Sequence, residues 1–127
     1  MFEPSGRLFN HLTFITFASQ LGNPVKFEIA PKSVEIKSNW DDARLYCFAL
    51  NIDGKTGWRL PTKKELNTFD KDEHDLEDLY YWSGQSRTDI STWVQKFNGY
   101  RHQFATHIES PNWVRPVRDL KIKRTKR

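Results

Sequence analysis

The ten-residue segment 57–66 (GWRLPTKKEL) constrains the fold of this chain most, because its residues prescribe one backbone geometry after another. Pro61 disfavours helical geometry at the residue before it. Thr62 and Glu65 stand three positions apart, the spacing of a capping box, in which each side chain accepts a hydrogen bond from the backbone amide at the other position. The segment therefore predicts an extended stretch ending at Pro61 and a short helix from Thr62 to Phe69.

A second helix is predicted before this segment, where apolar residues recur at the spacing of one helix face. The members of this face are Trp40, Ala43, Tyr46, Cys47 and Leu50. Ser38 or Asn39 can cap the helix, because both side chains carry an oxygen that accepts a hydrogen bond from a free amide of the first turn. We expect this face to lie in the core and Cys47 to pack there.

Apolar and β-branched residues predict strands on both sides of the helices. Before them, residues 12–17 and 25–29 read as two strands, and the turn formers of 21–24 join them as a hairpin. After them, residues 71–77 carry too many charges to be buried and predict a solvated loop. The pattern predicts an α+β fold with an N-terminal β-hairpin, two helices and then a twisted antiparallel sheet.

The strands of that sheet are predicted from four segments, which are 81–83, 92–97, 102–107 and 113–118. Asn98 and Gly99 form a hairpin turn between the middle two. Pro116 lacks an amide hydrogen, so the last strand is expected at a sheet edge or at a bulge. Residues 70–79 and 84–91 are predicted to be long polar connections.

A length of 127 residues fits one domain with a core of its own, and we assign it to residues 1–119. The one cysteine, Cys47, excludes an internal disulfide, and no Cys/His spacing matches a structural zinc site. No apolar run approaches the roughly 20 residues that a membrane-spanning helix needs. The start of the chain lacks the layout of a signal peptide, which favours a cytoplasmic or virion-associated protein over a secreted one.

Residues in a fixed order between Trp40 and Arg118 carry a family resemblance. They are Trp40, Ala43, Cys47, the segment 57–62, Glu65, Leu66, 81–83, Trp93, Phe97, Gly99 and 114–118. In this order they resemble the Lcl C-terminal-domain family, first described as a domain of unknown function in bacterial secreted or surface proteins and in phage-related proteins. The resemblance implies a C-type-lectin-like fold that displays variable loops on a stable scaffold.

The resemblance implies a non-enzymatic module that binds a glycan or a protein, with no cofactor. The ligand is expected at the loops after Phe69 and between Ser83 and Pro111. The candidate ligand-binding residues are Trp93, Tyr100, Arg101 and Trp113. The other three tryptophans are expected in the core, because large rings in a domain of this size are mostly buried.

Two chemistries of related folds match the chain poorly. Formylglycine-generating enzymes share the broad architecture and use paired cysteines, whereas this chain has only Cys47. Lectin-type calcium sites use a Glu-Pro-Asn arrangement followed by Trp-Asn-Asp. The segment 109–113 (ESPNW) has an inserted serine, and no Asn-Asp follows its tryptophan. We expect neither a catalytic site nor a metal site.

The arginines at 59, 115 and 118 admit two interpretations. They can bind anions, because a guanidinium matches carboxylate and phosphate oxygens bidentately. They can also brace the scaffold, since an arginine beside Trp58 or Trp113 can stack on the ring and pair with a carboxylate such as Glu65. We favour the scaffold role.

A basic tail, residues 120–127, supports an alternative function. Its cations are Lys121, Lys123, Arg124, Lys126 and Arg127. Such a cluster attracts phosphates through counterion release, so the tail is a candidate polyanion-binding segment. The alternative is therefore an intracellular nucleic-acid-associated protein. Its domain carries no nucleic-acid-binding motif, which favours recognition of a glycan or protein instead.

Overall fold

A computed structural model describes residues 26–99 and 101–120 of the chain. Its strands are β1 (Phe27–Ile29), β2 (Ile36–Ser38), β3 (Trp58–Arg59), β4 (Tyr80–Thr88), β5 (Ser91–Phe97), β6 (Arg101–His107), β7 (Asn112–Val114) and β8 (Val117–Asp119). Its helices are the 3-10 turn η1 (Lys32–Val34), α2 (Trp40–Ala49) and α3 (Lys63–Leu66). Residues 28–119 form one compact unit, which is described here by itself.

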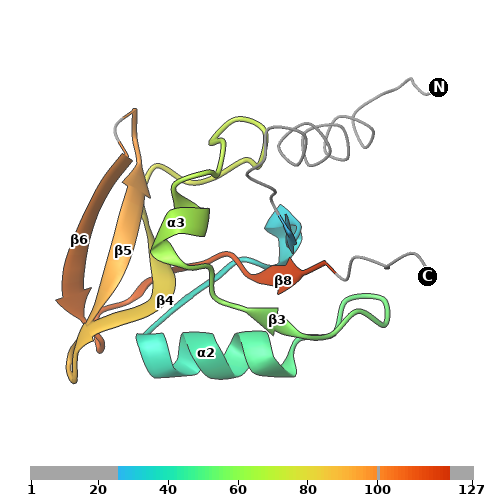
Figure 1. Cartoon of the computed structure of the whole chain (residues 1–127), viewed down its shortest axis with the longest axis horizontal. Coiled ribbons are helices and arrows are strands. Elements are labelled where there is room, and N and C mark those ends of the chain that lie inside the picture. Colours follow the sequence, from blue (N-terminus) through green and yellow to red (C-terminus); the bar gives the residue numbers. More distant parts are fainter. Residues whose placement is uncertain (1–25, 100, 121–127) are drawn as a thin grey trace, which may run out of the picture. The chain divides into compact units, whose positions relative to one another are not determined.

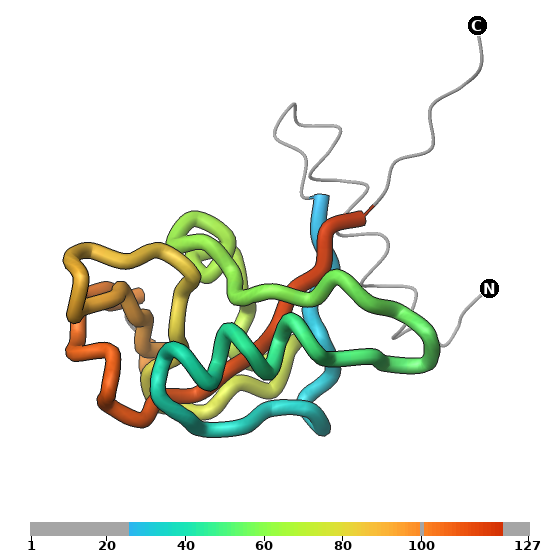
Figure 2. Tube along the Cα trace, turned by 90° about the horizontal axis from the view of Figure 1, so that it is seen from below, coloured from blue at the N-terminus to red at the C-terminus, as the bar shows by residue number. Residues whose placement is uncertain are grey.

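The strands form two sheets, so the predicted α+β class is confirmed. One has three strands in the order β1-β8-β3, and the other has five in the order β2-β7-β4-β5-β6. The registered pairs are antiparallel except β4 with β7. In Figure 1, β4, β5 and β6 lie together on the left, and α2 runs along the bottom of the view beneath β3. Figure 2 looks from below and has the coil of α2 in the foreground.

The helix α2 begins where the sequence predicts it. Asn39 is its cap, and the Asn39 side chain accepts a hydrogen bond of 2.8 Å from the amide of Asp42. Ala43 and Cys47 on the predicted inner face are fully buried. This helix also hydrogen-bonds the large sheet, because the Trp40 indole donates to the carbonyl of Ser83 at 2.9 Å.

The capping box at α3 is confirmed. Thr62 Oγ1 accepts from the amide of Glu65 at 3.0 Å, and Glu65 Oε1 accepts from the amide of Thr62 at 2.9 Å. The helix is shorter than predicted, because it ends at Leu66. The amides of Thr68 and Phe69 bond to carbonyls three residues back, which is the tighter pattern of a helix end. Phe69 nevertheless reaches the core, as predicted.

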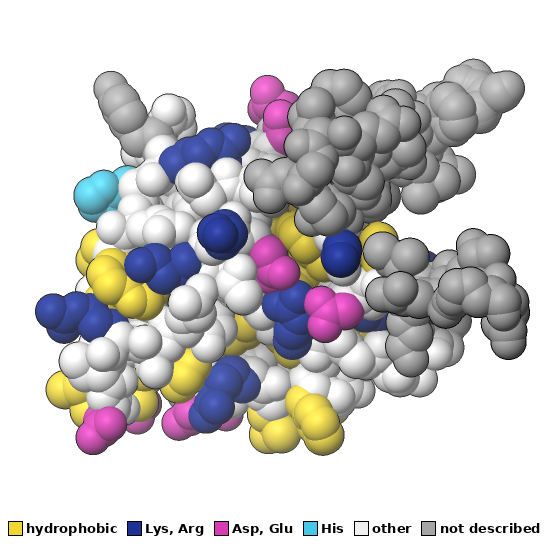
Figure 3. Space-filling model, viewed as in Figure 1, with side chains coloured by type: hydrophobic (Ala, Val, Ile, Leu, Met, Phe, Trp, Pro, Cys, Tyr) yellow, Lys and Arg dark blue, Asp and Glu magenta, His cyan; other side chains and the backbone are white. Residues whose placement is uncertain are grey.

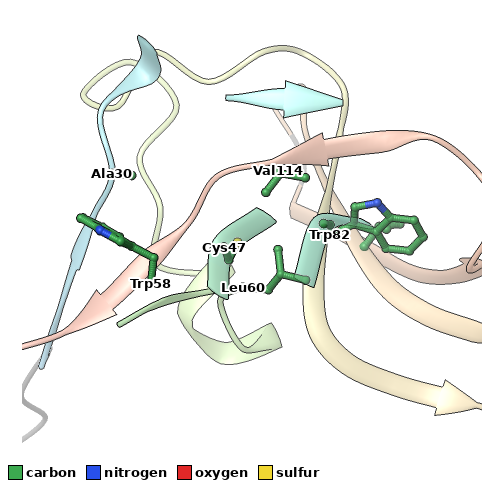
Figure 4. Packing of buried hydrophobic residues seen from close by; sticks show 8 residues of the cluster. Ala30, Cys47, Trp58, Leu60, Trp82 and Val114 are labelled. Carbon is green, nitrogen blue, oxygen red and sulfur yellow. The ribbon is translucent and has the colours of Figure 1, made fainter. Parts of the chain in front are cut away.

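One buried cluster joins the two sheets and α2. Trp58 from the small sheet and Trp82 from the large sheet both belong to it. Figure 4 shows Cys47, Leu60 and Val114 between these two rings. The two indoles also donate hydrogen bonds to carbonyls, Trp58 to Lys55 and Trp82 to Ser38. The expectation of a core shared by Trp58 and Trp82 is confirmed.

Three details of the predicted strands are wrong. The predicted connection 84–91 is mostly strand, because β4 continues to Thr88 and pairs with β5 through two register shifts. Both faces of this extension are exposed, so no apolar alternation marks it in the sequence. The predicted strand 113–118 is two strands, β7 and β8, which lie in different sheets on either side of Arg115 and Pro116. The strand β2 was not predicted.

The N-terminal hairpin lies mainly outside the described residues, which contain only its last part as β1. The single domain over residues 1–119 stays a prediction. The segment 71–77 is a loop of consecutive turns, as predicted, but Leu76 is buried within it. No helix among residues 26–99 and 101–120 is long and apolar enough to cross a membrane.

Candidate functional site

Among the predicted ligand-binding residues, Trp93 has the position best suited to contact a ligand. It lies in the middle of β5, where its side chain is half-buried. The ammonium group of Lys63, the first residue of α3, lies 3.7 Å from the centre of the indole ring. This distance is well within the range of a cation–π interaction. The pair offers a half-buried indole with a positive charge over one face of its ring.

Three glutamines hold the start of α3 against the large sheet. Gln85 Oε1 accepts from the amide of Lys63 at 2.7 Å. Gln103 Nε2 donates to the carbonyl of Lys63 at 3.0 Å and to Gln95 Oε1 at 2.6 Å. Because both backbone groups of Lys63 are fixed, its side chain starts from a defined position near Trp93. We did not predict these glutamines. Gln95 is fully buried and Gln103 is half-buried, so a polar residue at an inward strand position is their signal, whereas the exposed Gln85 carries none.

The other predicted ligand-binding residues do not join Trp93 in one patch. Arg101 lies opposite Phe97, four residues along β5 from Trp93, which is about 13 Å at the rise of a strand. Its guanidinium donates to the carbonyl of Phe69 at 2.7 Å. Trp113 lies in β7 beside Tyr81 of β4, two strands away from β5. These residues share one sheet face by register, and their binding roles stay predictions.

Tyr100 and the cations of the basic tail, Lys121, Lys123, Arg124, Lys126 and Arg127, lie outside the described residues. Their roles stay predictions as well.

The scaffold role of the arginines is confirmed at Arg59. This guanidinium makes two parallel hydrogen bonds to the carboxylate of Glu65, at 2.8 and 2.9 Å. It also donates to Asp119 at 2.6 Å and to the carbonyl of Leu60 at 3.1 Å. Burial raises the pKa of Glu65, but the hydrogen bonds from Arg59 and from the Thr62 amide outweigh it, so the net pKa lies below its usual value.

Arg118 and Arg115 are braces too. Arg118 pairs with Glu28 at 2.6 Å, and its guanidinium lies 5.8 Å from the centre of the Trp58 ring. Arg115 is only 3% exposed. It donates to the carbonyl of Ala30 at 2.7 Å, to Glu35 Oε2 at 2.7 Å and to the carbonyl of His74 at 2.6 Å.

The network of Arg115 extends through Tyr81 and fixes the loop before β4. The Tyr81 hydroxyl donates to Glu35 at 2.8 Å and accepts from the amide of Glu77 at 2.7 Å. Burial raises the pKa of Tyr81 well above its usual value, and Glu35 raises it further. Lys32 Nζ donates to the carbonyl of Asp75 at 2.8 Å and to Glu77 at 2.6 Å. This connection is therefore tied to the scaffold at His74, Asp75 and Glu77.

Cys47 is buried in the core, as predicted. Burial raises the pKa of its thiol to about 12, so the thiolate that a nucleophile requires is disfavoured. Among residues 26–99 and 101–120, no three His, Cys, Asp or Glu side chains come together in a group that could hold a metal ion.

A surface pocket of about 440 Å³ lies next to the glutamine group, between α2, β3 and β4. Phe48, Trp58, Leu60 and Gly84 provide its apolar wall, and Gln85 lies at its border with the glutamine group described above. Gly84 lets β4 approach closely here, because a Cβ at this position would lie 3.4 Å from the Leu60 side chain. Sequence reasoning did not find this pocket.

The family model of the Lcl C-terminal domain matches residues 22–118. This span includes all of the described strands and helices except the last residue of β8. No curated protein matches the chain.

Proposed function

The chain belongs to the Lcl C-terminal domain family, and from this we propose that it is a non-enzymatic recognition module that binds a glycan or a protein. We further propose that its scaffold is C-type-lectin-like. In support of this, two helices precede the strands β4 to β8, which is the order that the apolar pattern predicts. As a member of such a family, the module belongs with bacterial surface or phage-related proteins.

The Trp93–Lys63 pair is the observation that carries the proposal. A half-buried indole offers apolar area at little cost in conformational entropy, because its side chain has only two rotatable bonds. Gln85 on β4 and Gln103 on β6 hydrogen-bond the backbone amide and carbonyl of Lys63, and Gln95 on β5 supports Gln103. A site whose groups are fixed before the ligand arrives loses less entropy on binding.

Three groups that could take part in catalysis are engaged within the scaffold, which supports the proposal of binding over chemistry. Cys47 is buried with a raised thiol pKa. The guanidiniums of Arg59 and Arg115 are occupied by carboxylates and carbonyls of the scaffold. The partly exposed groups that remain around Trp93 are suited to stacking and hydrogen bonding.

A glycan array and a pull-down from bacterial surface extracts test the proposal. We expect a saturable ligand whose affinity falls at least about tenfold in Trp93→Ala, since this loss corresponds to about 1.4 kcal/mol. The matched control is Leu45→Ala, which removes an exposed apolar side chain of α2, outside the loops in which the ligand is expected. The proposal fails if no saturable ligand is found, or if Trp93→Ala and Leu45→Ala bind equally well.

The nucleic-acid alternative is tested with the same protein. DNA and RNA binding is measured with and without residues 120–127 over a series of salt concentrations. Strong binding that needs the tail and weakens steeply with salt would favour the alternative. Absence of such binding in both proteins would eliminate it.

A further inference from the structure

The helix α2 packs Trp40 and Tyr46 against the core, but it also leaves two large apolar side chains exposed. The fully buried positions are Ala43 and Cys47, whereas Leu45 is 65% exposed and Phe48 is 82% exposed. Leu45 and Phe48 are three residues apart, so they are neighbours on the helix surface. Large apolar side chains that adjoin on a surface mark an interaction site more often than single ones do.

The apolar pocket adjoins this exposed pair, because Phe48 is one of its lining residues. Its volume of about 440 Å³ is within the range of pockets that take ring-sized groups. Hydrophobic side chains are exposed along the lower edge of Figure 3, where Figure 1 places α2, and Lys or Arg side chains lie beside them. An aromatic knob and an apolar pocket therefore occupy one continuous surface.

The charges at this pocket are already neutralised within the chain. Arg44 pairs with Asp41 at 2.8 Å. Arg59 pairs with Glu65 at 2.8 Å and with Asp119 at 2.6 Å. The terminal nitrogens of Arg59 have four acceptors in total. An anionic ligand would have to displace these partners. The part of the surface that is open to a binding partner is therefore its apolar side chains. For the same reason, no net positive charge keeps two such surfaces apart.

We propose that two copies of this chain associate through this surface, with Phe48 of each copy inserted into the pocket of the other. A two-fold pair uses the same patch on both copies, so a contact from knob to pocket is made twice. This surface carries both halves of that contact. The inserted ring would lie against Trp58 and Leu60, and Leu45 would be covered beside it.

The association is expected to be weak and concentration-dependent. Two aromatic rings and their surroundings bury far less than the roughly 1,200–2,000 Å² of a standard stable interface. This inference does not depend on the recognition surface around Trp93, because it is measured without any ligand. A failure of one proposal therefore leaves the other standing.

Sedimentation equilibrium of the full chain over a wide concentration series tests the proposal. We expect a monomer–dimer equilibrium and an association constant that falls about 100-fold or more in Phe48→Ser. Each copy loses a buried ring, and each ring is worth about tenfold or more. Leu45→Ser should weaken association less, because its side chain is smaller and lies outside the pocket.

The matched control is Ile90→Ser, which removes an exposed apolar side chain (58% exposed) that is neither on α2 nor among the residues that line the pocket. It should leave the association constant unchanged. Phe48 is nearly fully exposed, so Phe48→Ser should keep the unfolding midpoint of the parent protein. A monomer at every concentration, or equal dimers from the parent and Phe48→Ser, would overturn the proposal.

Amide NMR spectra of the unmodified protein locate the contact. The amide signals of Gly84 and Gln85, which border the pocket, should shift with protein concentration, whereas that of Ile90 should not. If the concentration-dependent shifts exclude the pocket, the insertion of Phe48 is wrong even where a dimer forms. Shifts at the pocket that vanish in Phe48→Ser would support it.

Discussion

Arg115 and Lys63 each hold a cation against a side chain of this protein, Arg115 against Glu35 and Lys63 against the ring of Trp93. The first pair is buried, and the second lies at the surface. Arg115 and its partner Glu35 have only 4% and 3% of their side chains exposed. Lys63 lies over the half-buried ring of Trp93. A buried ion pair cannot lose one partner without leaving a charge unsolvated, whereas the exposed pair can lose its cation to water. The first arrangement therefore maintains the fold, and the second stays available to a ligand.

The strongest test of this difference is Arg115→Met. It should lower the free energy of unfolding by about 3 kcal/mol, the low end of the range for a broken buried pair, because the buried Glu35 would keep only the partly exposed Lys32, 3.2 Å away, as a counter-charge. Urea denaturation followed by tryptophan fluorescence measures this loss. Arg118→Met is the control, since the pair of Arg118 with Glu28 is partly solvated. An equal loss in both variants would contradict the importance of burial.

The next effect is expected from Tyr81→Phe. This change removes a hydroxyl that both donates to Glu35 and accepts from the amide of Glu77, so it should cost about 1–3 kcal/mol. Hydrogen exchange should also become faster at the amide of Glu77. Tyr46→Phe, which loses one bond to the carbonyl of Val34, should cost less. Unchanged exchange at Glu77 would show that Tyr81 does not hold this loop.

Glu65→Gln tests an ion pair of intermediate exposure, the pair of Glu65 with the partly exposed Arg59. The folded-state pKa of Glu65 is lowered, so its contribution to stability is present above the unfolded pKa of about 4.3 and is lost as the pH falls through the folded pKa. At pH 7 the substitution should cost about 1 kcal/mol or less, because glutamine can keep the capping box. Denaturation at several pH values should show a weaker loss of stability in acid for the variant. An unchanged pH dependence would contradict this role of Glu65.

The smallest effect is expected from the surface pair. A double-mutant cycle with Lys63→Met and Trp93→Leu should give a coupling energy of about 0.5–1 kcal/mol. Both substitutions keep much of the apolar volume, so the cycle isolates the interaction of the ammonium group with the ring. A coupling as large as the loss in Tyr81→Phe would place Lys63 in the scaffold and would weaken its assignment to recognition.

Local signals predicted local structure well in this chain. The cap at Asn39, the capping box of Thr62 and Glu65, and the hairpin at 98–99 each depend on residues that are close in sequence. The pairing of Arg59 with Glu65 was anticipated for the same reason, because the two are six residues apart. The extension of β4 to Thr88 was missed, since its stability comes from pairing with β5 and no apolar periodicity records that pairing.

The candidate site was only partly accessible to prediction. Trp93 was chosen for its ring, but neither its partner Lys63 nor the supporting Gln85, Gln95 and Gln103 followed from the sequence. These residues come from four elements, and a sequence separation of up to 40 residues gives no sign of their contact. The pocket beside Phe48 was missed for the same reason, because its walls come from α2, β3 and β4.

The sequence by itself determined the α+β class, the beginnings of both helices, the shared core of Trp58 and Trp82, and the family. These depend on local hydrogen bonding, on apolar periodicity and on motifs in a fixed order. Only the tertiary structure decided that the chain passes from one sheet to the other at Arg115 and Pro116. It also decided which cations are buried and which remain at the surface. Burial depends on all the elements packed around a residue, and that environment exists only when the chain has folded.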